Sequence, residues 1–146
     1  PLPGFPVVRD LVVDKTKVTD RVASAMKRQR AKPVTLDEIN APVDPDVYAK
    51  MDPLEHCARC GVCTAACPVV AEQGLKKFAG PTQMVATALR FYDPYDQGDR
   101  VLEAVQNGLF NCIQCGTCDD VCKALEIDHL ATWADLRAAA EERGLA

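Results

Sequence analysis

The sequence has no long apolar run. Its longest apolar stretches, such as the three residues from Leu11 to Val13, fall far short of the roughly 18 residues that a membrane-spanning helix needs. It also lacks a positively charged opening followed by an apolar stretch, so nothing in it indicates secretion. Basic residues are not in excess: 17 lysines and arginines against 21 aspartates and glutamates leave a net charge of −4, which argues against nucleic acid as a partner.

What remains is an ordinary globular composition. The chain has 146 residues, of which 48% are hydrophobic and 26% charged, and this excludes disorder as its main state. A chain of this length buries roughly two thirds of its surface on folding, so we expect one domain with its own core, or one domain with a tail. Because the chain begins with Pro1 and not with methionine, we expect it to be a piece of a longer protein.

The distinctive feature is a set of eight cysteines in two runs. Both runs read C-x2-C-x2-C-x3-C, and each cysteine of the second run lies 55 residues after its counterpart in the first. Gly61 and Gly116 repeat as well, and glycine suits a backbone that wraps closely around a bound group. The runs therefore form an internal repeat of one binding loop. Their members are Cys57, Cys60, Cys63 and Cys67, and then Cys112, Cys115, Cys118 and Cys122.

Three kinds of site use cysteines in this way. Disulfides are typical of short secreted chains, and closely spaced cysteines pair poorly because a disulfide needs opposed Cβ atoms. Structural zinc takes four ligands, usually from two separated C-x2-C pairs, whereas the first run holds four cysteines within eleven residues. Iron–sulfur cubanes are the third kind. This spacing, with Pro68 directly after Cys67, is the one associated with paired [4Fe-4S] clusters.

The spacing also predicts which cysteines share a cluster. Three thiolates two residues apart can reach three irons of one cube, whereas the fourth cysteine, one helical turn further on, points away and serves the other cube, as is usual for this motif in two-cluster ferredoxins. Eight ligands then fill two [4Fe-4S] clusters with none left over. We assign Cys57, Cys60, Cys63 and Cys122 to the first cluster and Cys67, Cys112, Cys115 and Cys118 to the second.

The rest of the chain predicts helices and no strand. Prolines favour an extended segment over residues 1–13 and an ordered loop over residues 33–45. Apolar positions at helical spacing, preceded by capping residues such as Thr19, Asp44 and Asp128, predict helices. We expect them over residues 19–30, 45–52, 81–92, 97–107 and 129–143. The class is therefore all-α, with the two cluster loops held between helices.

This pattern resembles a known family. Small bacterial ferredoxins hold two cubanes on β-hairpins with shorter spacing between the runs. Helices between the runs instead resemble the α-helical ferredoxin domain, the C-terminal half of the iron–sulfur subunit of succinate dehydrogenase and fumarate reductase. Residues 6–14 resemble the family's connector, which follows its N-terminal plant-type ferredoxin domain, and Gly80-Pro81 with Arg90, Phe91 and Asp93 resembles its helix between the runs. The chain also resembles the heterodisulfide-reductase C subunit and the thiol-dependent fumarate reductases.

Three departures from the family pattern bear on function. Most members have another residue where Cys115 stands and hold a three-iron cluster there, so this cysteine predicts two four-iron clusters. Lys123 replaces the usual proline after the last cysteine. Members that reduce quinone have a tryptophan shortly after the first run and a histidine beside the first cysteine of the second. Here residues 70–72 read Val-Ala-Glu and Ile113 takes the histidine's place, which argues against direct quinone binding.

The resemblance divides the chain into an extended connector plus one helix, residues 1–45, and an α-helical ferredoxin domain, residues 46–146. It implies a subunit that relays single electrons between a flavoprotein and a second acceptor or donor. The chain has no nucleotide-binding glycine fingerprint and no nucleophile constellation, so we do not expect it to be a complete enzyme. Alternatives are a heterodisulfide-reductase-type electron-transfer subunit, direct disulfide reduction at a solvent-open cluster, and a structural zinc protein.

The same resemblance implies partners and a location. The partners are a flavoprotein subunit, a [2Fe-2S] ferredoxin domain upstream of Pro1, and either a membrane anchor or a cysteine-rich subunit of the heterodisulfide-reductase type. We expect a cytoplasmic location, with a peripheral position on the inner face of the membrane where a partner provides it.

A few other side chains have two interpretations. Asp119 and Asp120 lie between cluster ligands, where their charge would disfavour reduction, but they also suit a solvated helix face. Trp133, at helical spacing with other apolar residues, indicates core packing. The adjacent pair Lys76 and Lys77 is suited to an acidic partner, although two lysines of this kind are usually solvated.

Overall fold

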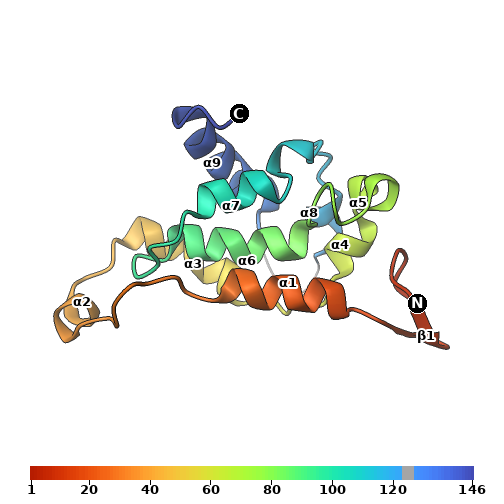
Figure 1. Cartoon of the computed structure of the whole chain (residues 1–146), viewed down its shortest axis with the longest axis horizontal. Coiled ribbons are helices and arrows are strands. Elements are labelled where there is room, and N and C mark those ends of the chain that lie inside the picture. The colour runs from red at the N-terminus through yellow and green to blue at the C-terminus, as the bar shows by residue number, and fades with distance from the viewer. Residues whose placement is uncertain (123–126) are drawn as a thin grey trace.

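The computed structural model describes residues 1–122 and 127–146, and helices dominate it (Figure 1). This confirms the all-α class, while Lys123 lies outside the described residues. The elements in chain order are β1 (Val7–Arg9), β2 (Val12–Val13), α1 (Thr16–Met26), α2 (Leu36–Asn40), α3 (Pro45–Glu55), α4 (Val62–Ala66), α5 (Pro68–Gln73), α6 (Pro81–Tyr92), α7 (Arg100–Gln106), the 3-10 helix η1 (Leu109–Asn111), α8 (Thr117–Val121) and α9 (His129–Glu142).

Helix α6 forms the centre of the fold, as its apolar sequence predicts. It has the expected bounds and is buried along most of its length, because α1, α3, α7 and α9 all contact it. Figure 1 shows α1 and α7 on opposite sides of α6. Pro81 occupies its first turn, where a missing N–H costs no hydrogen bond. The core prediction for Trp133 is confirmed, since it is fully buried. The largest buried apolar side chains are Trp133, Phe78, Met84, Leu109 and Leu136.

The N-terminal segment differs from the prediction. We expected no strand, but β1 and β2 pair antiparallel, with Val7 opposite Val13, around a turn in which Asp10 has a φ of 52°. Strands this short hold too few residues to show an alternating pattern, which is why the sequence did not reveal them. Helix α1 begins at Thr16 and not after Thr19, because the Asp14 carboxylate accepts the Thr16 N–H at 2.8 Å.

The proline-rich stretch also contains more helix than expected. Helix α2 lies within the predicted loop, where the Thr35 hydroxyl accepts the Glu38 N–H and the Glu38 carboxylate accepts the Thr35 N–H. Helix α3 continues through Pro53 to Glu55 and does not end before the proline. A proline removes one helical hydrogen bond, but Leu54 is buried in the core and holds the last turn in place.

The predicted C-terminal helix is confirmed, and α7 is shorter than expected. Asp128 caps α9 by accepting the Ala131 N–H at 2.8 Å. Helix α7 begins at Arg100, capped by Asp99, and not at residue 97. Within residues 1–122 and 127–146, no helix combines the length and the hydrophobicity that crossing a bilayer requires.

Buried ion pairs tie the chain after α1 to the loop between α6 and α7. The Asp93 carboxylate has no exposed surface; it accepts a hydrogen bond from Arg28 Nε at 2.7 Å and also pairs with Arg90. Arg100 pairs with Asp96 at 2.8 Å, and both side chains are almost fully buried. Charges withdrawn from water in this way are stable only while each keeps its partner. The network therefore fixes the C-terminal end of α6 against the start of α7, at the opposite ends of these helices from the cysteine runs.

Candidate metal centre

The two cysteine runs fold into equivalent loops. The residue before the second cysteine of each run, Arg59 or Gln114, has a positive φ of 52° or 54°. The glycine after that cysteine is left-handed as well and begins a short helix, α4 after Gly61 and α8 after Gly116. Helices α4 and α8 contact each other. The sequence repeat is thus a repeat in three dimensions, with the two loops facing each other across these helices.

The fourth cysteine of the second run lies beside the thiols of the first. Among the charges that raise the pKa of the Cys57 and Cys63 thiols, after burial itself, is that of Cys122. Cys60 acts on the same two thiols. This set therefore contains one cysteine that is distant in sequence but close in space.

The mirror arrangement holds for the second run. The thiol of Cys67 is among the charges that raise the pKa of Cys112, again after burial. One small cavity is lined by four cysteines and by apolar side chains that include Phe78 and Leu130. The two sets adjoin, because the charge of Cys63 raises the pKa of Cys118. The cavity's cysteines are Cys67, Cys112, Cys115 and Cys118.

All eight cysteines are free thiols, and they differ in exposure. Burial raises the pKa of Cys63 to about 11, although the Thr82 hydroxyl opposes the shift. Burial and the neighbouring Asp119 charge raise the pKa of Cys118 to about 12. Exposed Cys115 is the opposite case, since the Thr117 hydroxyl at 3.3 Å lowers its pKa. A soft cation that replaces the thiol protons would relieve the cost of burying these groups as thiolates.

The donor set fits an iron–sulfur cluster. Four thiols around an apolar cavity suit a sulfur-bridged cube, whose ligands are thiolates and whose surface needs little water. The backbone supports close approach, because positive φ values at the glycines turn the chain around the thiols. Among the described residues, no carboxylate lines this cavity, so hard cations are disfavoured there.

A buried pair of threonines, which sequence reasoning missed, anchors the first loop. Thr64 Oγ1 lies 2.7 Å from Thr82 Oγ1 and accepts the Thr82 N–H at 3.1 Å. Thr82 Oγ1 in turn lies 3.3 Å from the sulfur of Cys63. Gly80 permits this contact, since a Cβ there would lie 2.7 Å from Thr64 Cγ2. The only sequence signal was a threonine directly after the Gly80-Pro81 pair.

The two aspartates of the second run have different environments. Asp120 is exposed, which matches a solvated helix face, whereas Asp119 is half-buried. Asp119 Oδ1 accepts the backbone N–H of His129 at 2.7 Å and lies 2.8 Å from its Nδ1. His129 is 1% exposed, and one ligand atom each from Cys118, Asp119 and His129 lies within 4.8 Å of the others. Asp119 is thus placed beside a predicted cluster ligand.

Basic side chains hold the outer parts of both loops. Lys15 Nζ donates to the carbonyl of Cys60 at 3.3 Å, so the segment after the hairpin reaches the first loop. Arg137 Nη2 donates to the carbonyls of Leu109 at 3.1 Å and Cys112 at 2.5 Å, which joins α9 to the start of the second run. Each loop is therefore fixed by a cation from a distant part of the chain.

Comparison with known proteins agrees with this geometry. Residues 53–125 match the family described as the 4Fe-4S dicluster domain. The chain is 31% identical over 118 residues to a subunit of the fumarate reductase (CoM/CoB) of Methanothermobacter marburgensis, and the match covers 81% of this chain and 23% of that protein. It is 32% identical over 125 residues to the fumarate reductase iron-sulfur subunit of Escherichia coli O157:H7, covering 83% of this chain and 50% of the relative.

A solved structure shows the same fold. The Mycobacterium smegmatis Sdh1 complex in the apo form contains a chain that superposes with a TM-score of 0.85 at 24% identity, covering 100% of this chain and 62% of that one. The curated relatives are longer, and this chain spans half or less of the two named above.

Proposed function

Because the chain belongs to the family of 4Fe-4S dicluster domains, we propose that it relays single electrons through two [4Fe-4S] clusters between a flavoprotein and a second acceptor or donor. The observation that carries the proposal is the gathering of eight thiols into two adjoining sets, each made from both runs. Such clusters supply one-electron chemistry that needs no acid or base from the protein.

The proposed ligands follow from these neighbours. The first cluster takes Cys57, Cys60, Cys63 and Cys122, and the second takes Cys67, Cys112, Cys115 and Cys118. The proximity of Cys122 to Cys57 and of Cys67 to Cys112 supports this crossed assignment. Crossed ligation ties the two loops into one unit, so the gap that an electron crosses is set by α4 and α8, which contact each other.

The chain's own residues tune and hold these sites. Hydroxyl groups of Thr82 and Thr117 lie within 3.3 Å of the Cys63 and Cys115 sulfurs, and hydrogen bonds to sulfur favour the more negative, reduced form. The charge of Asp119 beside Cys118 acts in the opposite direction. We therefore expect the first cluster to be the easier one to reduce, because it has a hydroxyl at a buried ligand and is not the one that Asp119 adjoins.

A flavoprotein partner follows from the relatives, which are named as fumarate reductase and succinate dehydrogenase iron-sulfur subunits. We also propose the further partners that the sequence implied: a [2Fe-2S] ferredoxin domain upstream, and a membrane anchor or a cysteine-rich subunit on the other side. With such an anchor the assembly would lie at the inner, cytoplasmic face of a membrane.

A heterodisulfide-reductase-type subunit is the second candidate function. One relative belongs to a fumarate reductase named for CoM and CoB, which favours the thiol-dependent type over the quinone-dependent one. Ile113, where quinone-reducing members have histidine, is 65% exposed and its side chain offers no hydrogen bond to a quinone. Thiol-linked electron exchange through a cysteine-rich partner is the consistent alternative.

Metal analysis tests the proposal directly. Protein purified without oxygen should be brown, with broad absorption near 400 nm that bleaches on reduction, and should contain about eight iron and eight acid-labile sulfide per chain. A colourless protein with about two zinc ions would support the structural alternative and end the electron-transfer proposal.

Paired variants test the crossed assignment. Cys122→Ser should alter the EPR signal of the cluster held by Cys57, Cys60 and Cys63, although it lies in the second run. Cys67→Ser is the matched variant, and it should alter the other signal. If each variant altered the cluster of its own run, the assignment would be wrong.

Co-purification separates the two candidate functions. A partner with bound flavin and activity with fumarate or succinate supports the first, whereas a companion protein rich in cysteines supports the second.

A further inference from the structure

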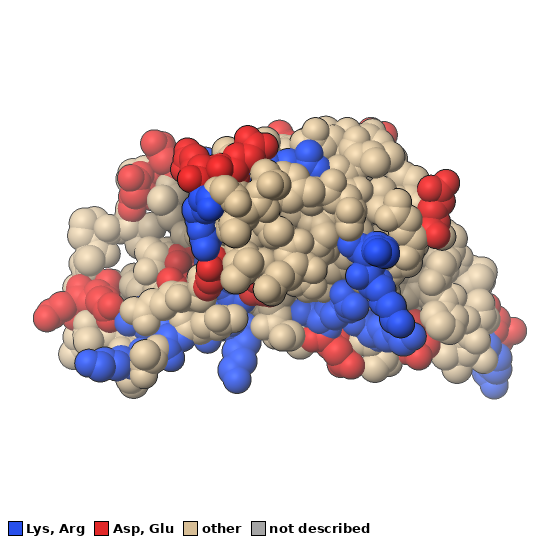
Figure 2. All heavy atoms as spheres, turned by 45° about the horizontal axis from the view of Figure 1, so that its top comes forward, with Lys and Arg blue, Asp and Glu red and all other residues tan. Residues whose placement is uncertain are grey.

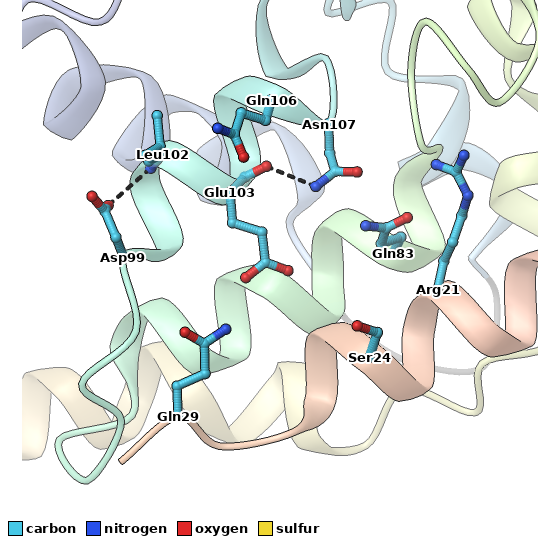
Figure 3. A pocket seen from close by; sticks show the side chains of 9 residues that line it. All are labelled: Arg21, Ser24, Gln29, Gln83, Asp99, Leu102, Glu103, Gln106 and Asn107. Atoms are coloured by element: carbon cyan, nitrogen blue, oxygen red, sulfur yellow. Dashed lines mark hydrogen bonds between the residues drawn. The ribbon is translucent and has the colours of Figure 1, made fainter. Parts of the chain in front are cut away.

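A polar groove lies between α1, α6 and α7, away from the cysteine cavity. It has a volume of about 510 Å³ and is open to solvent. Figure 3 shows Arg21 of α1 on one wall, Asn107 at the end of α7 above it, and Gln83 of α6 between them. Nothing in the proposed electron relay uses these side chains.

The floor of the groove contains an unsatisfied acceptor. Gln83 is 5% exposed, and its Oε1 is buried without a hydrogen bond from any described residue. Two neighbouring polar groups have partners: Glu103 pairs with Arg100 at 2.5 Å, and Asn107 Nδ2 donates to the Glu103 carbonyl at 2.8 Å. A buried acceptor without a donor destabilises the fold, so a ligand that supplies an N–H gains a hydrogen bond there.

One basic side chain, Arg21, lines the groove, and three lysines lie near it in the chain or in the fold. Lys17 and Arg21 lie one turn apart on the same side of α1. Leu75 packs against the buried cluster that α1 forms with Ala86 of α6, and the exposed residues Lys76 and Lys77 follow it directly in the chain. None of these four cations forms an ion pair within the described part of the chain. Figure 2 shows lysine and arginine side chains gathered right of centre on this face.

The segment between α5 and α6, residues 74–80, contains Lys76 and Lys77 and contacts residues beside both cysteine runs. The Lys77 carbonyl accepts a hydrogen bond from Asn111 Nδ2 at 2.6 Å and packs closely against Gly108. Asn111 is the residue directly before the second run. Three residues after Lys77, Gly80 packs on Thr64 in the first loop. A protein bound at the groove would therefore rest on the elements that carry the clusters.

We propose that this groove is the docking site for an acidic loop of an electron-transfer partner. A carboxylate of the loop pairs with Arg21, a backbone N–H reaches Gln83, and the surrounding lysines attract the loop and steer it. A short protein loop fits better than a membrane or a nucleic acid, because it can place one carboxylate at Arg21 and avoid Asp99 and Glu103, which also line the groove and are already paired with Arg143 and Arg100. The proposal rests on the relay function and names the chemistry of one partner.

The test uses the cluster-loaded chain and a fluorescent pentapeptide, Gly-Asp-Glu-Asp-Gly, blocked at both ends. Its neutral counterpart, Gly-Asn-Gln-Asn-Gly, is the control peptide. We expect saturable binding of the acidic peptide that weakens with salt, measured by fluorescence anisotropy. Arg21→Gln should weaken it about fivefold, as expected for a single half-exposed charge pair. Absence of binding by the acidic peptide, or equal binding of both peptides, would overturn the proposal.

Two further variants locate the binding. Gln83→Met should weaken binding without changing its salt dependence, because it removes an acceptor and not a charge. Lys32→Gln is the matched control; it removes an exposed lysine between α1 and α2 and should leave binding unchanged. An equal loss in Lys32→Gln and Arg21→Gln would indicate non-specific attraction and overturn the proposal. Stronger binding to vesicles of phosphatidylcholine with one third phosphatidylglycerol, lost in Arg21→Gln, would indicate a lipid site and refute the protein-loop proposal.

The two proposals fail separately. Iron, sulfide and EPR signals are measured on the same samples as peptide binding. Intact clusters without specific binding overturn the docking site alone, whereas specific binding by a chain that holds no iron overturns the electron relay alone.

Discussion

Gly108 is the position where the structure predicts the sharpest response to one added methyl group. The residue follows α7 with a φ of +87°, and a Cβ built there would lie 2.0 Å from the Lys77 carbonyl oxygen and 3.0 Å from Phe78 Cα. That oxygen is part of the backbone and accepts Asn111 Nδ2, so it cannot rotate aside. Moving it would pull on Phe78, which is 1% exposed in the core.

The cost of Gly108→Ala has two parts. A left-handed backbone costs a residue other than glycine about 1–2 kcal/mol. Forcing extra volume into a packed site costs about 1–3 kcal/mol more. Gly144→Ala is the matched control, because Gly144 also has a positive φ, +66°, after a helix, but no described atom lies within 4 Å of an added Cβ. Gly144→Ala should therefore incur only the cost of the left-handed backbone and not the packing cost.

Thermal unfolding measures the difference. A loss of one kcal/mol in the free energy of unfolding lowers the melting temperature of a chain of this size by about 2–4 °C. We therefore expect the melting temperature to decrease at least about twice as much in Gly108→Ala as in Gly144→Ala. The assay follows circular dichroism and the absorbance near 400 nm of the anaerobic protein. Equal decreases in the two variants would refute the close approach of Gly108 to Lys77.

Two other predictions follow from the buried charges and thiols. Asp93→Asn should destabilise the protein by about 3 kcal/mol, because it leaves two arginines without their buried carboxylate; a change below about 1 kcal/mol in urea unfolding would contradict the network. After anaerobic removal of metal, iodoacetamide near pH 8 should alkylate Cys115 before Cys63 and Cys118, since of these three only Cys115 has a lowered thiol pKa. Equal labelling by mass spectrometry would mean that the metal-free chain unfolds.

Helix boundaries were predictable where local signals were strong. Gly80-Pro81 begins α6 and Asp128 caps α9, as the sequence indicated, because capping depends on residues within one turn. The prediction was wrong at Pro53, where burial of Leu54 outweighs the local effect of the proline. Long-range packing of that kind leaves no local signal.

The sequence by itself determined the prediction of an iron–sulfur site, which the match to the 4Fe-4S dicluster domain supports. Eight cysteines at one repeated spacing specify a thiolate site, because ligand type and loop length are local properties. Only the tertiary structure decided which distant groups meet. It brought Cys122 to the first run, Thr82 to Cys63 and His129 to Asp119, and it formed the polar groove between α1, α6 and α7. These contacts join residues far apart in the chain, and their formation depends on how the helices pack around α6, which no short stretch of sequence encodes.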